Sequence, residues 1–127
     1  MRIASVSENI NIEKRIAITP DIAKKYIALG FEVSLSENYG SHLGFSDDGY
    51  KELGAKFSDN DNAVLSNSNI IIQLGLLSNE NISLLKENQT LVGVFNPYLN
   101  QEKILNLTKK NINVFSLEML PRITRAQ

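Results

Sequence analysis

Arginine supplies the most distinctive chemistry in this 127-residue sequence, which contains four arginines. Arg2 and Arg15 lie around the first polar loop, whereas Arg122 and Arg125 fall within the last six residues. A planar guanidinium group can hold a carboxylate, a phosphate or a carboxamide through paired hydrogen bonds, which lysine cannot imitate. The simpler alternative is that these side chains are solvated or pair with carboxylates such as that of Glu8. The pattern suggests a binding role and leaves the ligand open.

Other reactive side chains are scarce. The sequence has no cysteine and one histidine, so a thiol nucleophile, a disulfide framework or an imidazole-built metal site is not expected. His42 lies between glycines and is expected in a turn, while Asp47 and Asp48 are explained as first-turn charges of a helix. Neither a GxGxxG loop nor a P-loop is present, so we do not expect this chain to hold a dinucleotide by itself.

Length and charge narrow the class of protein. A chain of 127 residues with 43% hydrophobic residues predicts a single domain over residues 1–127. The net charge of -1 gives no electrostatic argument for nucleic acid or an anionic membrane surface as partner. The absence of cysteine fits a reducing compartment, and no apolar run suits a membrane span.

The elements that must position these residues alternate between helix and strand. Thr19 and Pro20 predict the start of a helix that ends near Leu29, and Gly30 leads into a strand over residues 31–36 with unlike faces. Similar signals predict the remaining strands and helices, with Asn100 as the cap of the last helix. Further strands are expected at residues 2–6, 55–57, 69–75, 90–95 and 112–115, with helices after Ser46, Ser78 and Asn100 and a weak one at 63–66.

This alternation predicts an α/β fold with a doubly wound, mainly parallel sheet, Rossmann-like or flavodoxin-like. Ligands of such sheets bind outside the carboxyl ends of the strands. That rule selects four segments as the candidate functional edge, namely Ser7–Arg15, Gln73–Leu76, Asn96–Tyr98 and Ser116–Gln127.

Residues 13–57, EKRIAITPDIAKKYIALGFEVSLSENYGSHLGFSDDGYKELGAKF, resemble the N-terminal signature shared by alanine dehydrogenases and the alpha subunit of NAD(P) transhydrogenase. The end of the sequence, MLPRITRAQ, is similar to a stretch of transhydrogenase alpha subunits whose arginine and glutamine approach the nicotinamide of bound NAD(H). By position, the resemblance implies Arg122 and Gln127 as cofactor-binding residues, with Thr124 in place of a serine.

Two departures separate the branches of this family. Alanine dehydrogenases hold the keto acid with an arginine in the first loop, a lysine after the central strand and a histidine after the next strand. Arg15 matches the first, but Gln73 stands at the second and Asn96–Tyr98 near the third. A neutral amide cannot supply the charge that polarises a carbonyl, so the resemblance favours the transhydrogenase branch.

The resemblance implies the first domain of the NAD(H)-binding component of a proton-translocating transhydrogenase, an oxidoreductase that transfers hydride between NAD(H) and NADP(H). It implies a second NAD-binding domain that is needed for tight binding, NADP(H) on a partner subunit, membrane-embedded subunits and a homodimeric component. The expected location is cytoplasmic, peripheral on the inner face of a bacterial plasma membrane.

Two alternatives stay open. One is a domain of an alanine or saccharopine-type NAD-dependent dehydrogenase that uses Arg15 on a substrate carboxylate. The other is a non-catalytic remnant or interaction module. In the leading interpretation no residue of this chain performs covalent or acid-base chemistry, and the chain alone is not expected to be competent.

Overall fold

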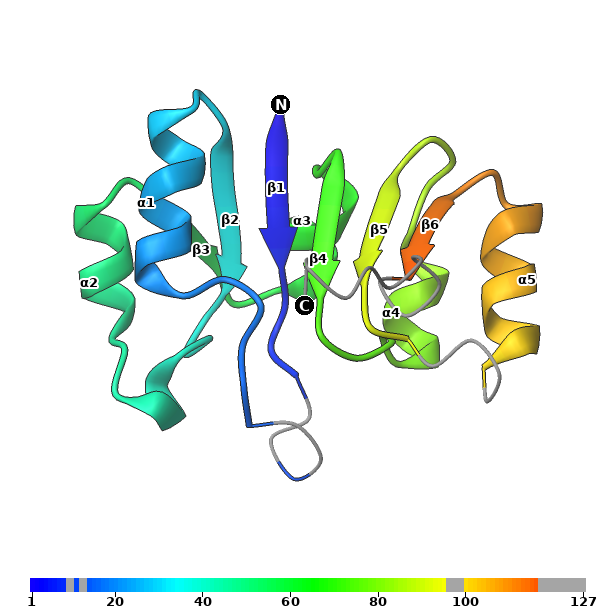
Figure 1. The fold of residues 1–127 in the computed structure, drawn as a ribbon, viewed down its shortest axis with the longest axis horizontal. Coiled ribbons are helices and arrows are strands. Elements are labelled where there is room, and N and C mark those ends of the chain that lie inside the picture. Colours follow the sequence, from blue (N-terminus) through cyan, green and yellow to red (C-terminus); the bar gives the residue numbers. More distant parts are fainter. Residues whose placement is uncertain (9–10, 12–13, 96–99, 117–127) are drawn as a thin grey trace, which may run out of the picture.

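A computed structural model gives the fold of the chain and describes residues 1–8, 11, 14–95 and 100–116. These residues form one parallel sheet with the strand order β3-β2-β1-β4-β5-β6 (Figure 1). This is the strand order of dinucleotide-binding doubly wound folds, and it differs from that of flavodoxin. The predicted fold class is confirmed. The strands are β1 (Arg2–Ser5), β2 (Glu32–Ser36), β3 (Lys56–Ser58), β4 (Ile70–Gln73), β5 (Thr90–Gly93) and β6 (Asn113–Ser116).

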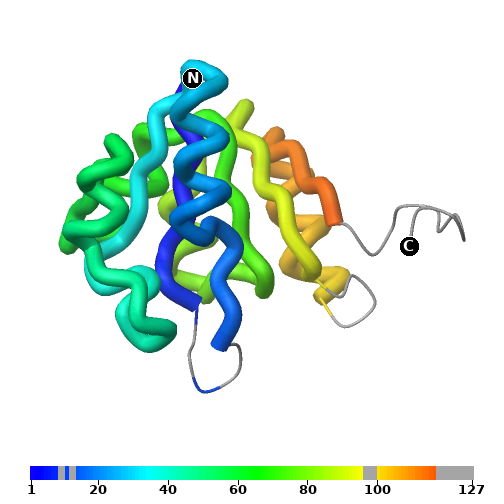
Figure 2. Tube along the Cα trace, turned by 60° about the vertical axis from the view of Figure 1, so that its left-hand side comes forward, coloured from blue at the N-terminus to red at the C-terminus, as the bar shows by residue number. Residues whose placement is uncertain are grey.

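Helices cover the sheet on two sides, as right-handed crossovers require (Figures 1 and 2). One apolar cluster joins the sheet to α1 and α2, through residues such as Ala23 and Tyr50. A second cluster joins it to α3 and α5, through Val64 and Leu107. The sheet is therefore the middle layer between two cores. The helices are α1 (Pro20–Ala28), α2 (Asp47–Glu52), α3 (Asp61–Ser66), α4 (Asn79–Ser83) and α5 (Gln101–Lys109).

Helix α1 begins and ends where the sequence predicts. The Thr19 hydroxyl accepts a hydrogen bond from the Ile22 N–H at 3.4 Å, and Pro20 is the first helical residue. Gly30 has a φ of +97°, a left-handed conformation that glycine adopts at low cost. The chain can therefore turn directly from α1 into β2.

One local prediction is wrong, and another is correct in position but not in its hydrogen bond. The alternation of residues 31–36 predicts unlike faces, yet Ser34 and Ser36 are buried together with Val33 and Leu35, because β2 lies inside a sheet covered on both sides. Asn100 occupies the N-cap position of α5, as predicted, but its side chain makes no capping hydrogen bond to the helix. Its Nδ2 instead donates to the Phe95 carbonyl oxygen at 2.7 Å, which ties the start of α5 to the segment after β5.

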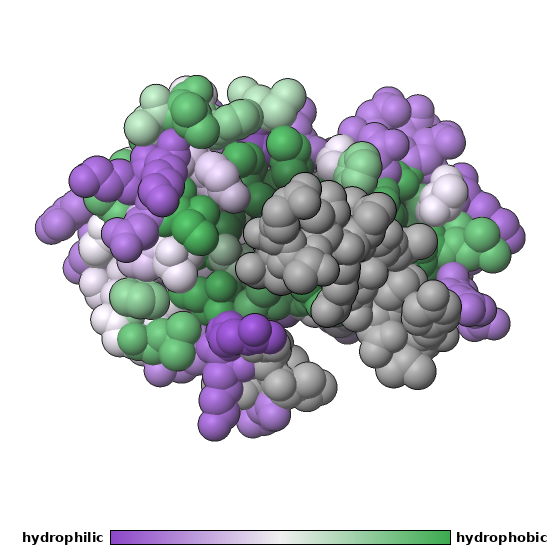
Figure 3. Space-filling model, in the orientation of Figure 1, coloured by the Kyte–Doolittle hydropathy of each residue, from purple (hydrophilic) through white to green (hydrophobic). Residues whose placement is uncertain are grey.

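The carboxyl ends of the strands meet at one edge, and the segment that leaves β1 lies at this edge (Figure 1). On the described part of the face seen in Figure 3, hydrophobic and hydrophilic side chains are interspersed. Among the described residues, no helix combines the length and the apolar character needed to cross a membrane.

Candidate functional site

The point where the winding of the sheet reverses lies between β1 and β4, which pair with Ile3 opposite Ile70 and Ala4 opposite Ile71. In doubly wound sheets the ligand crevice opens beyond the carboxyl ends of these two strands. The first loop and the segment Gln73–Leu76, which the sequence assigns to this edge, are brought together here. This switch point is our candidate functional site.

The Gln73 side chain joins the ends of the two strands. Its Oε1 accepts hydrogen bonds from the Ser5 hydroxyl at 3.0 Å and from the Val6 N–H at 2.8 Å. Its Nε2 donates to the Val6 carbonyl oxygen at 3.1 Å and to Glu8 Oε2 at 2.8 Å. Gln73 is only 2% exposed, and all four of these hydrogen bonds are made within the protein.

The Glu8 carboxylate lies against the loop that follows β4. Its Oε2 accepts from the Leu74 N–H at 2.9 Å, and its Oε1 accepts from the Gly75 N–H at 3.2 Å. Together with the Gln73 amide, these groups surround one carboxylate with three donors. Charge-assisted hydrogen bonds of this kind are stronger than those between neutral groups. Glu8 therefore fastens the first loop to β4.

A buried phenol extends this network toward α1. The Tyr39 hydroxyl lies 2.8 Å from the Ser5 hydroxyl and accepts from the Ala17 N–H at 3.1 Å and the Ile18 N–H at 3.2 Å. Burial raises the pKa of Tyr39 above its usual value, and its hydrogen bonds oppose the shift only in part. The phenol is thus neutral at physiological pH and serves as a structural junction.

Tyr50 and two serines contribute further described polar contacts near this edge. The Tyr50 hydroxyl donates to the Ile18 carbonyl oxygen at 2.8 Å, and burial raises the pKa of Tyr50 far above its usual value. The Ser36 hydroxyl lies 3.0 Å from that of Ser7 and accepts from the Ser7 N–H at 2.8 Å. These contacts are neutral, so they position the loop without acid-base chemistry.

Sequence patterns do not single out Ser5 or Tyr39 as members of this site. Glu8 falls within the segment Ser7–Arg15 that the sequence assigns to this edge, and as a single residue it is expected as a partner for arginine. The sequence shows only that polar residues follow two apolar strands. This pattern indicates the edge of the sheet but not which polar side chains bond to each other.

The predicted binding residues have different outcomes. Arg15 is exposed and precedes the buried Ile16 at the start of the segment leading into α1. Arg122 and Gln127 lie outside the described residues, as does Asn96–Tyr98. Their assignment to a nicotinamide site or a substrate site stays a prediction.

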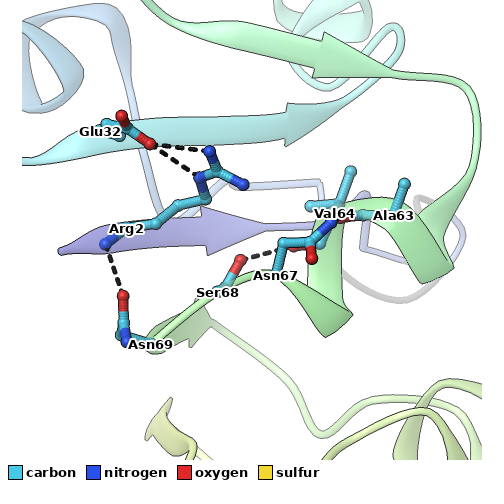
Figure 4. A network of polar contacts seen from close by, with 7 residues as sticks. All are labelled: Arg2, Glu32, Ala63, Val64, Asn67, Ser68 and Asn69. Atoms are coloured by element: carbon cyan, nitrogen blue, oxygen red, sulfur yellow. Dashed lines mark hydrogen bonds and ion pairs between the residues drawn. The ribbon is translucent and has the colours of Figure 1, made fainter.

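Arg2 has a structural role at the opposite edge of the sheet. Its guanidinium group donates from Nε and Nη2 to Glu32 Oε2 at 3.0 and 2.8 Å, a pairing that the β1–β2 register sets up (Figure 4). The hydrogen bond from Arg2, together with the nearby Lys56, lowers the pKa of Glu32. Asn69 anchors the same strand, because its Oδ1 accepts from the Arg2 N–H at 2.8 Å.

His42 and Asp47 lie where the sequence predicts. His42 is exposed on a 3-10 turn, with its Nε2 2.6 Å from the Lys14 carbonyl oxygen. Asp47 begins α2, and its Oδ2 also accepts from the Asn38 N–H at 3.0 Å. Both residues have a structural explanation.

An open concavity of about 810 Å³ lies between the segment after β3 and α4, and its lining is acidic and polar. Its carboxylates do not suit an anionic ligand, and no group of three or more His, Asp or Glu side chains among the described residues is arranged to hold a metal ion. The lining residues are Asp59, Asn60, Asp61, Asn62, Glu80, Asn81, Ser83 and Leu84.

The described residues of the switch point do not fit the pyrophosphate of a dinucleotide. A phosphate at this position requires free backbone N–H groups on a glycine-rich turn. Here the N–H groups of Leu74 and Gly75 already hold the Glu8 carboxylate, which would repel a phosphate. Any dinucleotide bound near this edge must have its phosphates held elsewhere.

Comparison with known proteins agrees with the doubly wound fold described above. The family described as alanine dehydrogenase/PNT, N-terminal domain matches residues 5–127. The chain belongs to this family. It is 34% identical over 131 residues to the first part of NAD(P) transhydrogenase subunit alpha from Rickettsia prowazekii, and the match covers all of this chain and 34% of that protein. The resemblance inferred from the sequence is confirmed.

Solved structures place the alanine dehydrogenase/PNT N-terminal domain in the same fold. The structure of transhydrogenase from Sinorhizobium meliloti matches with a TM-score of 0.90 and 27% identity, over 100% of this chain and 38% of that chain. An L-alanine dehydrogenase structure matches with a TM-score of 0.84 at 18% identity, over 91% of this chain and 32% of that one, which shows the fold alone. The chain spans about a third of the length of the curated relative.

Proposed function

We propose that this chain is the first domain of the NAD(H)-binding component of a proton-translocating NAD(P) transhydrogenase. The reaction of that enzyme is hydride transfer between NAD(H) and NADP(H). The proposal is supported by the 34% identity to a transhydrogenase alpha subunit across the whole of this chain. It is also supported by the TM-score of 0.90 against a transhydrogenase structure.

The observation that carries the choice between the two branches of the family is the burial of Gln73. Alanine dehydrogenases place a lysine here to hold the keto acid. In this chain the position holds a neutral amide that is 2% exposed and bonded to Ser5, Val6 and Glu8. A keto acid would therefore find no cation at this point. Direct transfer between two nicotinamides needs no such group, because the cofactors carry the chemistry.

In this proposal Arg122 and Gln127 bind the nicotinamide end of NAD(H), with the guanidinium group and the amide directed at the carboxamide. A second domain with a glycine-rich loop holds the pyrophosphate. This agrees with the switch point, where the Glu8 carboxylate already binds the N–H groups of Leu74 and Gly75. Further proposed partners are an NADP(H)-binding subunit, membrane-embedded subunits and a second copy of the NAD(H) component. The assembly would lie on the cytoplasmic face of a bacterial plasma membrane.

A domain exchange tests the proposal on this chain as it exists. The matching third of the Rickettsia prowazekii relative is replaced by residues 1–127, and the chimera is combined with the remaining transhydrogenase subunits. We expect NADH to reduce an NADP analogue. The same exchange in an alanine dehydrogenase should abolish the reaction with pyruvate and ammonia. The opposite pair of results would assign the chain to the dehydrogenase branch, and loss of both activities in folded chimeras would favour a non-catalytic module.

The role of Arg122 has a matched control in Arg125, which carries the same charge three residues later. In the active chimera, Arg122→Ala should weaken NADH binding and slow hydride transfer by about tenfold or more, because a charged hydrogen bond is lost. Arg125→Ala should have the smaller effect. Unchanged NADH affinity and transfer rate in Arg122→Ala would remove the assigned role.

A further inference from the structure

Two consecutive backbone N–H groups converge on a single carboxylate just beyond β4. The Leu74 N–H donates to Glu8 Oε2 at 2.9 Å and the Gly75 N–H to Oε1 at 3.2 Å, so each oxygen has its own donor. The Gln73 amide adds a donor at 2.8 Å from Oε2. Converging backbone N–H groups are a geometry with which proteins bind phosphate and carboxylate groups. The donors of this loop thus match an oxyanion that offers two oxygens.

We propose that Leu74 N–H, Gly75 N–H and the Gln73 amide form an oxyanion-binding site at the switch point, in which the Glu8 carboxylate is the resident internal ligand. A free oxyanion takes this site when the carboxylate is removed. The ligand class is a phosphate or a carboxylate group, since both present paired oxygens to the donors.

The receptor and its internal ligand come from different parts of the chain. Gln73 ends the central strand β4 and Leu74 and Gly75 follow it directly, while Glu8 reaches them from the loop after β1, 66 positions away from Leu74. Exchanging the Glu8 side chain therefore removes the ligand and leaves the strand that holds the donors in place. A Cβ built on Gly75 would lie 3.5 Å from Glu8 Oε1, so the carboxylate fills the space directly above this residue.

The Gln73 amide is also fixed by hydrogen bonds to residues other than Glu8. Its Oε1 accepts from Ser5 and Val6 and its Nε2 also donates to the Val6 carbonyl oxygen, which fixes the amide plane without help from Glu8. The donors are consequently preorganised for a new anion after the carboxylate is removed. Preorganisation lowers the ordering cost of binding.

The test follows the backbone amide resonances of Leu74 and Gly75 by NMR during titration with inorganic phosphate and, separately, with acetate. In the wild-type chain these resonances should not respond, because Glu8 holds the site. In Glu8→Ala they should shift and saturate, with an affinity at least about tenfold above that of the wild type, as expected for regaining charged hydrogen bonds. Saturation by phosphate alone or by acetate alone assigns the anion class.

Glu52→Ala is the matched control. Glu52 is exposed on α2, and its removal changes the net charge by the same amount as the removal of Glu8. This variant should behave like the wild type in both titrations. If it gains the same response, the effect is one of net charge and the proposed site is refuted.

A folded Glu8→Ala variant whose Leu74 and Gly75 resonances stay unchanged in both titrations would also overturn the proposal. If Glu8→Ala does not fold, Glu8→Asp replaces it, since its shorter carboxylate cannot reach both donors equally and should give partial competition. Failure of both variants to fold would make Glu8 a requirement of folding and refute its exchange for a free anion. The titrations use no nucleotide, so their outcome is separate from that of the proposed transhydrogenase function.

Discussion

Replacing Gln73 with alanine should lower the free energy of unfolding by about 3 to 5 kcal/mol. The Gln73 amide makes four hydrogen bonds, three with neutral groups and one with the Glu8 carboxylate. Neutral bonds contribute about 1 kcal/mol each and a bond to a charged group about 1.5 to 3 kcal/mol, and bonds within one network are not fully additive. The variant also leaves the Val6 N–H buried without its acceptor.

Urea denaturation followed by circular dichroism measures this change, and the denaturant slope should stay constant. The melting temperature should fall by about 10 to 20 °C, as expected for a chain of this size. Gln101→Ala is the control, because Gln101 is exposed at the start of α5 and its loss should change stability by less than about 0.5 kcal/mol. Gln73→Met keeps the volume of the side chain and removes the hydrogen bonds.

Equal stabilities of Gln73→Ala and Gln101→Ala would refute the reasoning, since the buried amide would then contribute nothing that water cannot replace. A Gln73→Met variant as stable as the wild type would show that side-chain volume, and not hydrogen bonding, holds β1 to β4. We expect Gln73→Met to lose most of what Gln73→Ala loses.

Three further predictions concern other parts of the fold. Gly93→Ala should destabilise the chain by about 3 kcal/mol or more in urea denaturation, because a Cβ would lie 2.0 Å from a backbone oxygen of the neighbouring strand. Gly75→Ala is the control: its Cβ would come no closer than 3.5 Å to another residue, so the substitution should be tolerated. Burial raises the pKa of Tyr39, so this phenol should ionise only when the chain unfolds. Its stabilising effect is present below the ordinary tyrosine pKa of about 10 and is lost as pH rises beyond that value, and the absorbance of the phenolate measures the ionisation. Arg2→Gln should raise the pKa of Glu32 toward its usual 4.5 in an NMR titration, since the Arg2 hydrogen bond lowers it, and the wild-type pair should stop stabilising the fold as pH falls through that lowered pKa.

The fold could be predicted because its signals are local. Thr19 and Pro20 mark the start of α1 and Gly30 follows its end, and each acts through backbone geometry that does not depend on distant parts of the chain. The apolar run at Ile70–Gln73 likewise predicts a central strand from its own composition. Alternation between such segments leaves few topologies besides a parallel sheet.

The candidate site could be predicted only as an edge. The bonds from Gln73 to Ser5 and Glu8 join residues 68 and 65 positions apart, and no local pattern records such a pairing. Arg2 gives a second example. It pairs with Glu32, a residue that is opposite it in the β1–β2 register and that periodicity alone could not select. The roles of Arg122 and Gln127 stay predictions from the family resemblance.

The bond between Ser5 and Gln73 has a consequence for how the nascent chain acquires its shape. Strand β1, which ends at Ser5, leaves the ribosome early, yet its partner Gln73 is synthesised 68 residues later. Until β4 emerges and pairs with β1, the loop after β1 lacks its contacts with Gln73 and with the backbone N–H groups that follow it, and long-range contacts of this kind form late because chain closure costs entropy. The edge that we assign to ligand binding therefore cannot be completed during synthesis before β4 has emerged.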